Sequence, residues 1–283
     1  MENILSGCPV LEVLQLKACR GSNCLNICSP KLTTLEIECW VFGSDGESFL
    51  EISAPYILDL TISWIFVDFH FRIKNLSSVV RASFCSFVQD DWETYGTPDV
   101  MNSIMQLLES LKSLEELELR PCCIEIFSVL EMKGLKLPPS KVSCLTLTPS
   151  NNTESIAGIL GFLKSSPNLK TLVIKGRKLY HDEVYVTQDQ AAAYLQNGNL
   201  DLDLFHLKTM KIIGFKGFLS GPMHMLVQVL LRSAKVLEKI VISAEEEPFE
   251  ISSTNTTAID LANFALKLGA LPKVSTEAVV LVC

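Results

Sequence analysis

The chain has 283 residues, 48% of them hydrophobic and 20% charged, and its formal net charge is -8 at pH 7. Nucleic-acid affinity depends on clustered lysine and arginine, which this acidic sequence lacks, so we expect no nucleic-acid partner. The most apolar stretch, residues 57–73, contains Asp59, Asp68, His70 and Arg72. These polar residues interrupt it too often for a membrane span, so we expect no membrane partner either.

The first residues contain neither a basic segment nor a long apolar core, so a secretory signal is not expected. We therefore expect the chain in the cytoplasm, the nucleus or both. Ten cysteines and the sequons at Asn75, Asn151 and Asn255 would suggest disulfides and glycans only in a secreted protein. The cysteines are better explained as reduced, small core residues.

An apolar triplet with the spacing L-x-x-L-x-L recurs nine times, and this is the strand signature of a leucine-rich repeat. The copies are Leu11/Leu14/Leu16, Leu32/Leu35/Ile37, Ile57/Leu60/Ile62, Val79/Ala82/Phe84, Leu114/Leu117/Leu119, Val142/Leu145/Leu147, Leu169/Leu172/Ile174, Leu207/Met210/Ile212 and Leu237/Ile240/Ile242. The last two apolar residues of each copy point to one side of a short strand, and the residue between them points away. Stacked copies predict an α/β solenoid with a curved, mostly parallel sheet and one open, concave face.

Two further marks accompany the triplet. Residues 11–19 (LEVLQLKAC) and 114–122 (LEELELRPC) extend the consensus to a cysteine. Four copies have a proline two residues before the first apolar position, which predicts an extended segment leading into the strand: Pro9, Pro30, Pro55 and Pro167. By subtraction, the first positions are 21, 25, 22, 35, 28, 27, 38 and 30 residues apart, so we expect irregular curvature.

In the N-terminal half the repeats are short and rich in strand formers. Residues 25–27 and the alternating apolar run of residues 65–73 predict extra extended segments on the convex side.

In the C-terminal half, helical spacing of apolar residues predicts helices over residues 99–112, 154–164 and 222–236. Each of these is expected to pack behind the strand that follows it. Residues 176–200 break the pattern and predict a loop with one short helix near residues 190–195.

No catalytic pattern is present. The sequence contains no phosphate loop, no H-E-x-x-H and no G-x-S-x-G, and its paired cysteines lack C-x-x-C spacing. The four histidines lie in unrelated segments: His70, His181, His206 and His224. We therefore expect a non-enzymatic protein with no catalytic residue, no cofactor and no metal site. The competing hypothesis, a hydrolase or thiol enzyme within residues 176–200, lacks a paired nucleophile and base.

The residues that point away from the core are the candidate protein-binding site on the concave face. They are Gln15, Lys17, Glu36, Glu38, Thr61, Ser63, Glu118, Arg120, Thr146, Thr148, Lys175 and Lys211, with Val173 between them. Acids stand on early strands and lysines on later ones, which would orient a partner that carries both signs of charge. The alternative is an ordinary solvated strand face.

Five segments resemble plant F-box/leucine-rich-repeat proteins with a C-terminal FBD region. They are LSGCPVLEVLQLKAC (5–19), SPKLTTLEI (29–37), LKTMKIIGFKG (207–217), LLRSAKVLEKIVI (230–242) and LGALPKVSTEAVVLV (268–282). The resemblance implies a leucine-rich-repeat array over residues 1–197. It also implies an FBD-like C-terminal region over residues 198–283, continuous with the solenoid.

In that family an F-box docks on the adaptor subunit of a cullin-RING ubiquitin ligase while the repeats hold the substrate. No F-box is seen in this sequence. The resemblance therefore implies an interaction module with an unknown protein substrate, and with the ligase adaptor as a partner only if an upstream F-box exists. Two alternatives stay open: the repeat domain of an intracellular immune receptor, and a truncated paralogue without a ligase role.

Overall fold

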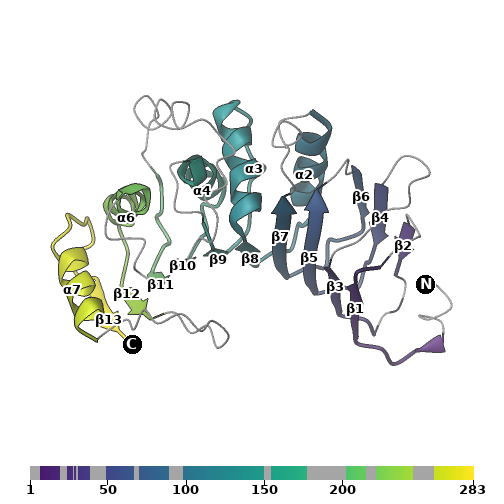
Figure 1. The fold of residues 1–283 in the computed structure, drawn as a ribbon, viewed down its shortest axis with the longest axis horizontal. Helices are drawn as coiled ribbons and strands as arrows, with labels where there is room; N and C mark the ends of the chain where they lie inside the picture. The colour runs from purple at the N-terminus through teal and green to yellow at the C-terminus, as the bar shows by residue number, and fades with distance from the viewer. Residues whose placement is uncertain are drawn as a thin grey trace.

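The computed structural model describes residues 7–19, 24–27, 29, 31–38, 49–66, 70–88, 98–149, 154–176, 202–214, 221–244 and 258–283. They form an arch with the N- and C-termini at opposite ends (Figure 1). Strands line one side of the arch along its whole length, and helices cover the other side from the middle to the C-terminal end. The architecture is therefore an open array and not a closed barrel.

One parallel sheet of ten strands runs through the described part of the chain. In spatial order its strands are β1 (Val13–Lys17), β3 (Thr34–Glu38), β5 (Asp59–Phe66), β7 (Arg81–Val88), β8 (Glu116–Leu119), β9 (Cys144–Leu147), β10 (Thr171–Lys175), β11 (Thr209–Ile213), β12 (Lys239–Ser243) and β13 (Val279–Val282). All nine triplets form strands of this sheet, so the predicted α/β leucine-rich-repeat solenoid is confirmed. The tenth strand, β13, has no triplet and was not predicted.

The strand register places equivalent triplet residues side by side. Leu145 of β9 lies opposite Leu117 of β8 and Leu172 of β10, and all three are at most 2% exposed. Burying one such side chain stabilises the fold by roughly 1.5–3 kcal/mol. The core is therefore a set of continuous apolar ladders under the sheet.

Recurring backbone hydrogen bonds set this stacking. The N–H of the first triplet residue donates to the carbonyl three residues earlier at Leu11, Ile57, Val79, Leu114, Leu169 and Leu207. Pro55 and Pro167 occupy the second position of such turns, where their fixed φ is favourable, so the predicted extended segment is in fact a β-turn. Between repeats one carbonyl accepts two N–H groups, as Glu115 does from Ser143 (2.8 Å) and Cys144 (3.0 Å).

The convex side of the N-terminal half carries a second parallel sheet of three strands, β2 (Cys24–Asn26), β4 (Phe49–Ser53) and β6 (His70–Lys74). The extended segment predicted over residues 25–27 is confirmed by β2. The prediction of one convex segment over residues 65–73 is wrong in part, because Ile65 belongs to β5 of the main sheet and only the end of the run forms β6. Strand β4 was not predicted.

Helices form the convex side of the C-terminal half: α2 (Pro98–Ser110), α3 (Pro121–Met132), α4 (Glu154–Ser165), α6 (Gly221–Ser233) and α7 (Ala258–Gly269). The three predicted helices correspond to α2, α4 and α6, with ends that differ by at most three residues. Helices α3 and α7 were not predicted, and the short helix expected near residues 190–195 lies outside the described residues. No helix among the described residues is long and apolar enough to cross a bilayer.

Helices α3 and α4 pack closely because the chain has a small residue at their crossing. The backbone N–H of Gly158 donates to Oγ of the buried Ser128 (2.8 Å), and that hydroxyl donates to the carbonyl of Ile124 (3.1 Å). Phe127 and Phe162 fill the space beside this contact, with ring centroids 5.7 Å apart. This joint holds the middle of the array together behind β8, β9 and β10.

Candidate protein-binding face

The outward residues of the main sheet form three rows that follow the arch, and we call these rows the concave face. The first row is Val13, Thr34, Asp59, Arg81, Glu116, Cys144, Thr171, Thr209, Lys239 and Val279. The second row is Gln15, Glu36, Thr61, Ser83, Glu118, Thr146, Val173, Lys211, Val241 and Leu281. The third row contains Lys17, Glu38, Ser63, Cys85, Lys175, Ile213 and Ser243.

Ten of the twelve candidate residues lie on strands, in two of these rows. Gln15, Glu36, Thr61, Glu118, Thr146 and Lys211 are in the second row, and Lys17, Glu38, Ser63 and Lys175 are in the third. Arg120 and Thr148 stand just past the ends of their strands, and Arg120 is the N-cap of α3. Their backbone N–H groups still donate to the neighbouring strand, at Phe84 (3.2 Å) and Leu119 (2.9 Å), and so continue the ladder by one residue.

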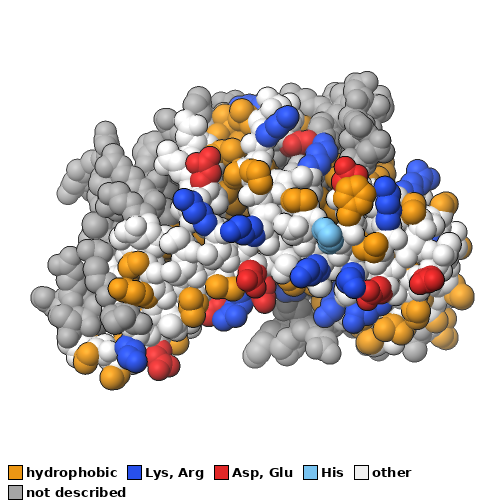
Figure 2. Space-filling view, turned by 180° about the vertical axis from the view of Figure 1, so that it is seen from behind, with side chains coloured by type: hydrophobic (Ala, Val, Ile, Leu, Met, Phe, Trp, Pro, Cys, Tyr) orange, Lys and Arg blue, Asp and Glu red, His pale blue; other side chains and the backbone are white. Residues whose placement is uncertain are grey.

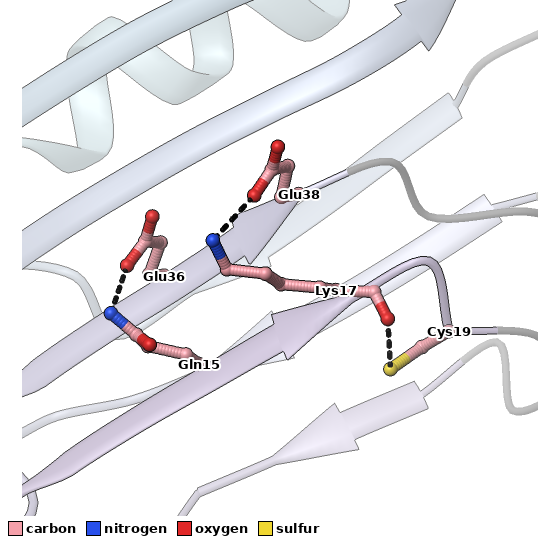
Figure 3. A network of polar contacts seen from close by, with 5 residues as sticks. All are labelled: Gln15, Lys17, Cys19, Glu36 and Glu38. Carbon is pink, nitrogen blue, oxygen red and sulfur yellow. Dashed lines mark hydrogen bonds and ion pairs between the residues drawn. The ribbon is translucent and has the colours of Figure 1, made fainter.

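At the N-terminal end, charged and polar side chains of adjacent strands bond to one another (Figure 3). Gln15 Nε2 donates to Glu36 Oε2 (2.6 Å), and Lys17 Nζ lies 3.0 Å from Glu38 Oε2. The hydrogen bond from Lys17 to Glu38 raises the pKa of Lys17, and the charges of Glu38 and Glu36 add to the increase. Both candidate glutamates are therefore already partnered within the face.

The next pair of strands carries a two-point ion pair. Nη2 of Arg81 on β7 donates to Oδ2 of Asp59 on β5 (2.8 Å), and Nε of the same guanidinium donates to Oδ1. The hydrogen bonds to Asp59 raise the pKa of Arg81. The planar guanidinium matches both carboxylate oxygens, so this pair has a defined geometry as well as opposite charges.

Glu118 is the central acid of the face. Its carboxylate accepts a hydrogen bond from Ser83 Oγ (3.4 Å) on one side and from Lys175 Nζ (3.2 Å) on the other. Lys175 belongs to β10, so its side chain reaches across β9 to make this contact. Glu118 thereby connects β7 on one side with β10 on the other.

The C-terminal half of the face is different in charge. Strands β9 to β13 contain no aspartate or glutamate, while Lys175, Lys211 and Lys239 point outward from three adjacent strands. Among the described residues, Lys211 and Lys239 have no carboxylate partner. This half therefore presents cations that the face itself does not neutralise.

Apolar side chains share that half of the face. In the second row Val241 lies beside Lys211 and is partly exposed, Leu281 ends the row at 44% exposure, and Val173 on the other side of Lys211 is buried. Hydrophobic side chains, in orange, gather at the C-terminal end of the array, at the lower right of Figure 2. The surface is thus suited to a partner that offers both negative charge and apolar contacts.

The sequence prediction missed the first row, which supplies Asp59, Arg81, Glu116 and Lys239. It considered only the residues after the second and third apolar positions of each triplet. The missing signal was the alternation of the strand, because the residue just before the second apolar position shares the outward side.

Burial perturbs one thiol on this face. Burial raises the pKa of Cys144, Glu116 adds to the increase, and Lys211 opposes it. A raised pKa makes a cysteine a poor nucleophile, because the thiolate is the reactive form. No group of three or more histidine, cysteine, aspartate or glutamate side chains that could hold a metal lies within the described residues. The arrangement offers ionic, hydrogen-bonding and apolar contacts along an extended surface.

Known proteins share this chain's sequence pattern. The LRR-domain family described as At1g61320/AtMIF1 matches residues 1–266. The putative F-box/LRR-repeat protein At3g18150 of Arabidopsis thaliana is 29% identical over 255 residues, which are 87% of this chain and 53% of that protein. The putative F-box protein At1g49610 of the same plant is 32% identical over 60% of this chain and 43% of its own length.

The probable F-box protein At1g60180 of Arabidopsis thaliana is 28% identical and covers 86% of this chain and 74% of its own length. The chain thus spans about half the length of most of these curated relatives. No solved structure matches it. Because the family match covers almost the whole array of parallel strands, the chain belongs to the At1g61320/AtMIF1 LRR-domain family.

Proposed function

We propose that this chain is the partner-holding part of a plant F-box/LRR-type substrate adaptor of a cullin-RING ubiquitin ligase. The observation that carries the proposal is the open concave face, on which two rows of side chains are continuous over ten strands and a third row covers seven of them. Proteins named for an F-box together with leucine-rich repeats are similar to most of this chain. Those names favour this hypothesis over the repeat domain of an immune receptor.

In this proposal the chain acts by binding and not by catalysis. The concave face holds a protein substrate, and an F-box recruits the ligase adaptor. Residues 198–283 are an FBD-like section that continues the array of residues 1–197. The site of action is the cytoplasm, the nucleus or both.

Charge reversal on the concave face tests the proposal. The double variant Glu36→Lys/Glu38→Lys disrupts the contacts with Gln15 and Lys17 and changes the charge of the face by four units. In affinity capture from plant extract followed by mass spectrometry, we expect it to lose proteins that the unmodified chain retains. The fold should persist, because substitutions on an exposed strand face usually change stability by less than about 0.5 kcal/mol.

The matched control is Glu109→Lys/Asp203→Lys, which makes the same charge change at two exposed residues outside the concave rows. It should retain the same proteins as the unmodified chain. Equal capture by both double variants would contradict a role for the concave face in partner binding.

A further inference from the structure

Three lysines lie on a diagonal across adjacent strands of the concave face. Lys175 is in the third row on β10, Lys211 in the second row on β11, and Lys239 in the first row on β12. Each step moves one strand along the sheet and two residues back along the strand. With strands about 4.8 Å apart and a rise of about 3.3 Å per residue, neighbouring Cα atoms on this lysine diagonal are roughly 8 Å apart.

Two of the three lysines on the diagonal have no neutralising carboxylate among the described residues. Lys211 and Lys239 are exposed and have no carboxylate partner among the described residues. Lys175 Nζ lies 3.2 Å from a carboxylate oxygen of Glu118, which belongs to β8, two strands away from β10. In the N-terminal half, by contrast, Lys17 and Arg81 each have a carboxylate on the adjacent strand.

The surroundings of the lysine diagonal also favour an acidic ligand. Exposed Lys170 stands just before β10, and exposed Lys235 lies in the turn between α6 and β12 with its Nζ 4.8 Å from the centre of the Phe205 ring; neither belongs to an ion pair among the described residues. Lys208 and Glu238, just before β11 and β12, pair with each other at 2.7 Å. Partly exposed Val241 lies beside Lys211 in the second row, so an apolar contact is available next to the charge, whereas Val173 on the other side is buried.

We propose that the lysine diagonal docks an extended acidic peptide segment of the protein partner, with a carboxylate at every second residue. This proposal rests on the proposed function and specifies the chemistry of the partner. In an extended peptide, side chains on one face repeat about every 6.6–6.8 Å, close to the spacing of the lysine diagonal, and flexible lysine side chains take up the difference. The peptide would lie obliquely to the strands, with small or apolar side chains near Val241.

A peptide fits these observations better than a nucleic acid does. The whole chain carries a net charge of -8, which repels a polyanion outside the lysine diagonal. Binding to a phosphate backbone depends on many clustered cations, whereas the diagonal offers three, with apolar residues among them.

Fluorescence anisotropy with defined probes tests this proposal on the full chain. The probe is a fluorescein-labelled peptide of about twelve residues, long enough to cross the five C-terminal strands, with glutamate alternating with serine. Its control has glutamine in place of every glutamate, and a single-stranded oligonucleotide of equal charge is the third probe. We expect measurable binding of the acidic peptide alone, weakening as salt is raised.

Charge removal then locates the site. Lys211→Gln and Lys239→Gln should each weaken acidic-peptide binding about three-fold, and the double variant about ten-fold, as expected for partly exposed ion pairs. Lys267→Gln, an exposed lysine on α7 away from the concave rows, is the matched control and should bind like the unmodified chain. Circular dichroism confirms that each variant is folded.

Glu118→Gln is a variant that should strengthen binding of the acidic peptide instead of weakening it. It releases Lys175 from its carboxylate partner, so the acidic peptide should bind about two-fold more tightly. A gain of binding cannot come from loss of folding. Unchanged or weaker binding in this variant would remove Lys175 from the site.

Equal binding of the glutamine peptide, or unchanged affinity in the Lys211/Lys239 double variant, would overturn the proposal. Tighter binding of the oligonucleotide that depends on the same lysines would overturn it in favour of a nucleic acid. These failures are distinct from failure of the proposed function. If protein capture still depends on Glu36 and Glu38, only the lysine diagonal is wrong.

Discussion

The two halves of the array have the same concave strands but different convex sides. From β1 to β7 the chain returns through the short strands β2, β4 and β6, whereas from β8 onwards the described return segments are the helices α3, α4, α6 and α7. The first triplets are 21, 25 and 22 residues apart, and the helical repeats that begin at Leu114, Val142 and Leu207 span 28, 27 and 30 residues, by subtraction of their numbers. A strand advances about 3.3 Å per residue and a helix about 1.5 Å, so a short repeat can cover the same distance only when extended.

This difference shows that the triplet and the repeat length control separate features of the fold. The triplet determines the strand and its register, which are equivalent at β3 and at β10. Repeat length determines which element covers the convex side. The charge pattern changes one strand later, because β8 still carries Glu116 and Glu118. Strands β1 to β7 pair ions across the face, whereas β9 to β13 contain no acidic residue and leave Lys211 and Lys239 unpaired among the described residues.

The largest effect is expected where the helical half depends on close packing. A Cβ at position 158 would lie 2.2 Å from the carbonyl oxygen of Ile124 and 2.6 Å from Ser128 Oγ. Gly158→Ala must push α3 and α4 apart, which should cost about 3 kcal/mol of the free energy of unfolding. The midpoint of urea unfolding, followed by circular dichroism, measures this loss.

Gly269→Ala is the control for that variant. No atom lies within 4 Å of a Cβ at the end of α7, so the substitution should leave stability nearly unchanged. Equal midpoints for the two alanine variants would mean that the α3 and α4 joint does not hold the helical half together.

A smaller effect is expected for the convex strands. Ile52 of β4 is fully buried, and Ile52→Val removes one methylene group at a cost of about 1 kcal/mol. Ile37→Val on the concave strand β3, where Ile37 is 1% exposed, should cost about the same. A loss for Ile52→Val much below that for Ile37→Val would show that the convex strands add little to the N-terminal half.

The sequence predicted the elements with a clear periodicity and missed those without one. The triplet placed nine strands because its apolar residues, such as Leu145 and Leu172, are the ones that the sheet buries. Helix α3 has no polar side facing the solvent, since almost every residue from Cys123 to Leu130 is buried, so its sequence shows little amphipathic pattern. Pro121 at the start of α3 was the available signal.

For the candidate site, the sequence predicted which residues point outward but not which side chains contact one another. Outward strand positions followed from alternation, but side-chain partners depend on which strands become neighbours. Glu118 meets Lys175 across β9 although the two are 57 residues apart in the sequence. No local pattern encodes that contact, so the pairing of the N-terminal ions became visible only in the structure. The same holds for Lys211 and Lys239, which have no carboxylate partner in the part of the chain that the structure describes.

Cys144 lies between the acidic strand β8 and the lysines of the C-terminal strands. Its ionisation should therefore respond to Glu116 and to Lys211. Its raised pKa should make alkylation slow below about pH 9, with a rate that increases as the pH rises further. Because folding raises this pKa, the associated stability is present below pH 9.0 and is lost as the pH rises through the folded value. Site-resolved mass spectrometry after iodoacetamide treatment, with exposed Cys283 as internal control, measures the rates.

Two substitutions should shift the Cys144 profile in opposite directions. Lys211→Gln removes the cation that lowers the pKa of Cys144, so alkylation should become slower at a given pH. Glu116→Gln removes an anion that raises this pKa, so alkylation should become faster. Identical profiles for both variants would show that burial alone controls this thiol.

The smallest effect is expected at the N-terminal end, where the side chain of Lys17 is exposed to solvent. Its pKa is raised first by the hydrogen bond to Glu38, then by the charge of Glu38, and less by that of Glu36. Glu38→Gln should therefore return the pKa of Lys17 most of the way to 10.5, and Glu36→Gln should lower it only slightly. An NMR titration of the lysine side-chain resonances distinguishes the two variants.

The direction of the linked stability change follows from the same contact. Because the folded state raises the pKa of Lys17, the contribution of the pair is complete below pH 10.5 and is lost as the pH rises through the raised value. Glu38→Gln should remove that dependence, while Glu109→Gln, at an exposed residue of α2 outside the concave rows, should leave it intact. A pKa for Lys17 that stays raised in Glu38→Gln would contradict the internal neutralisation that distinguishes the N-terminal half from the C-terminal half.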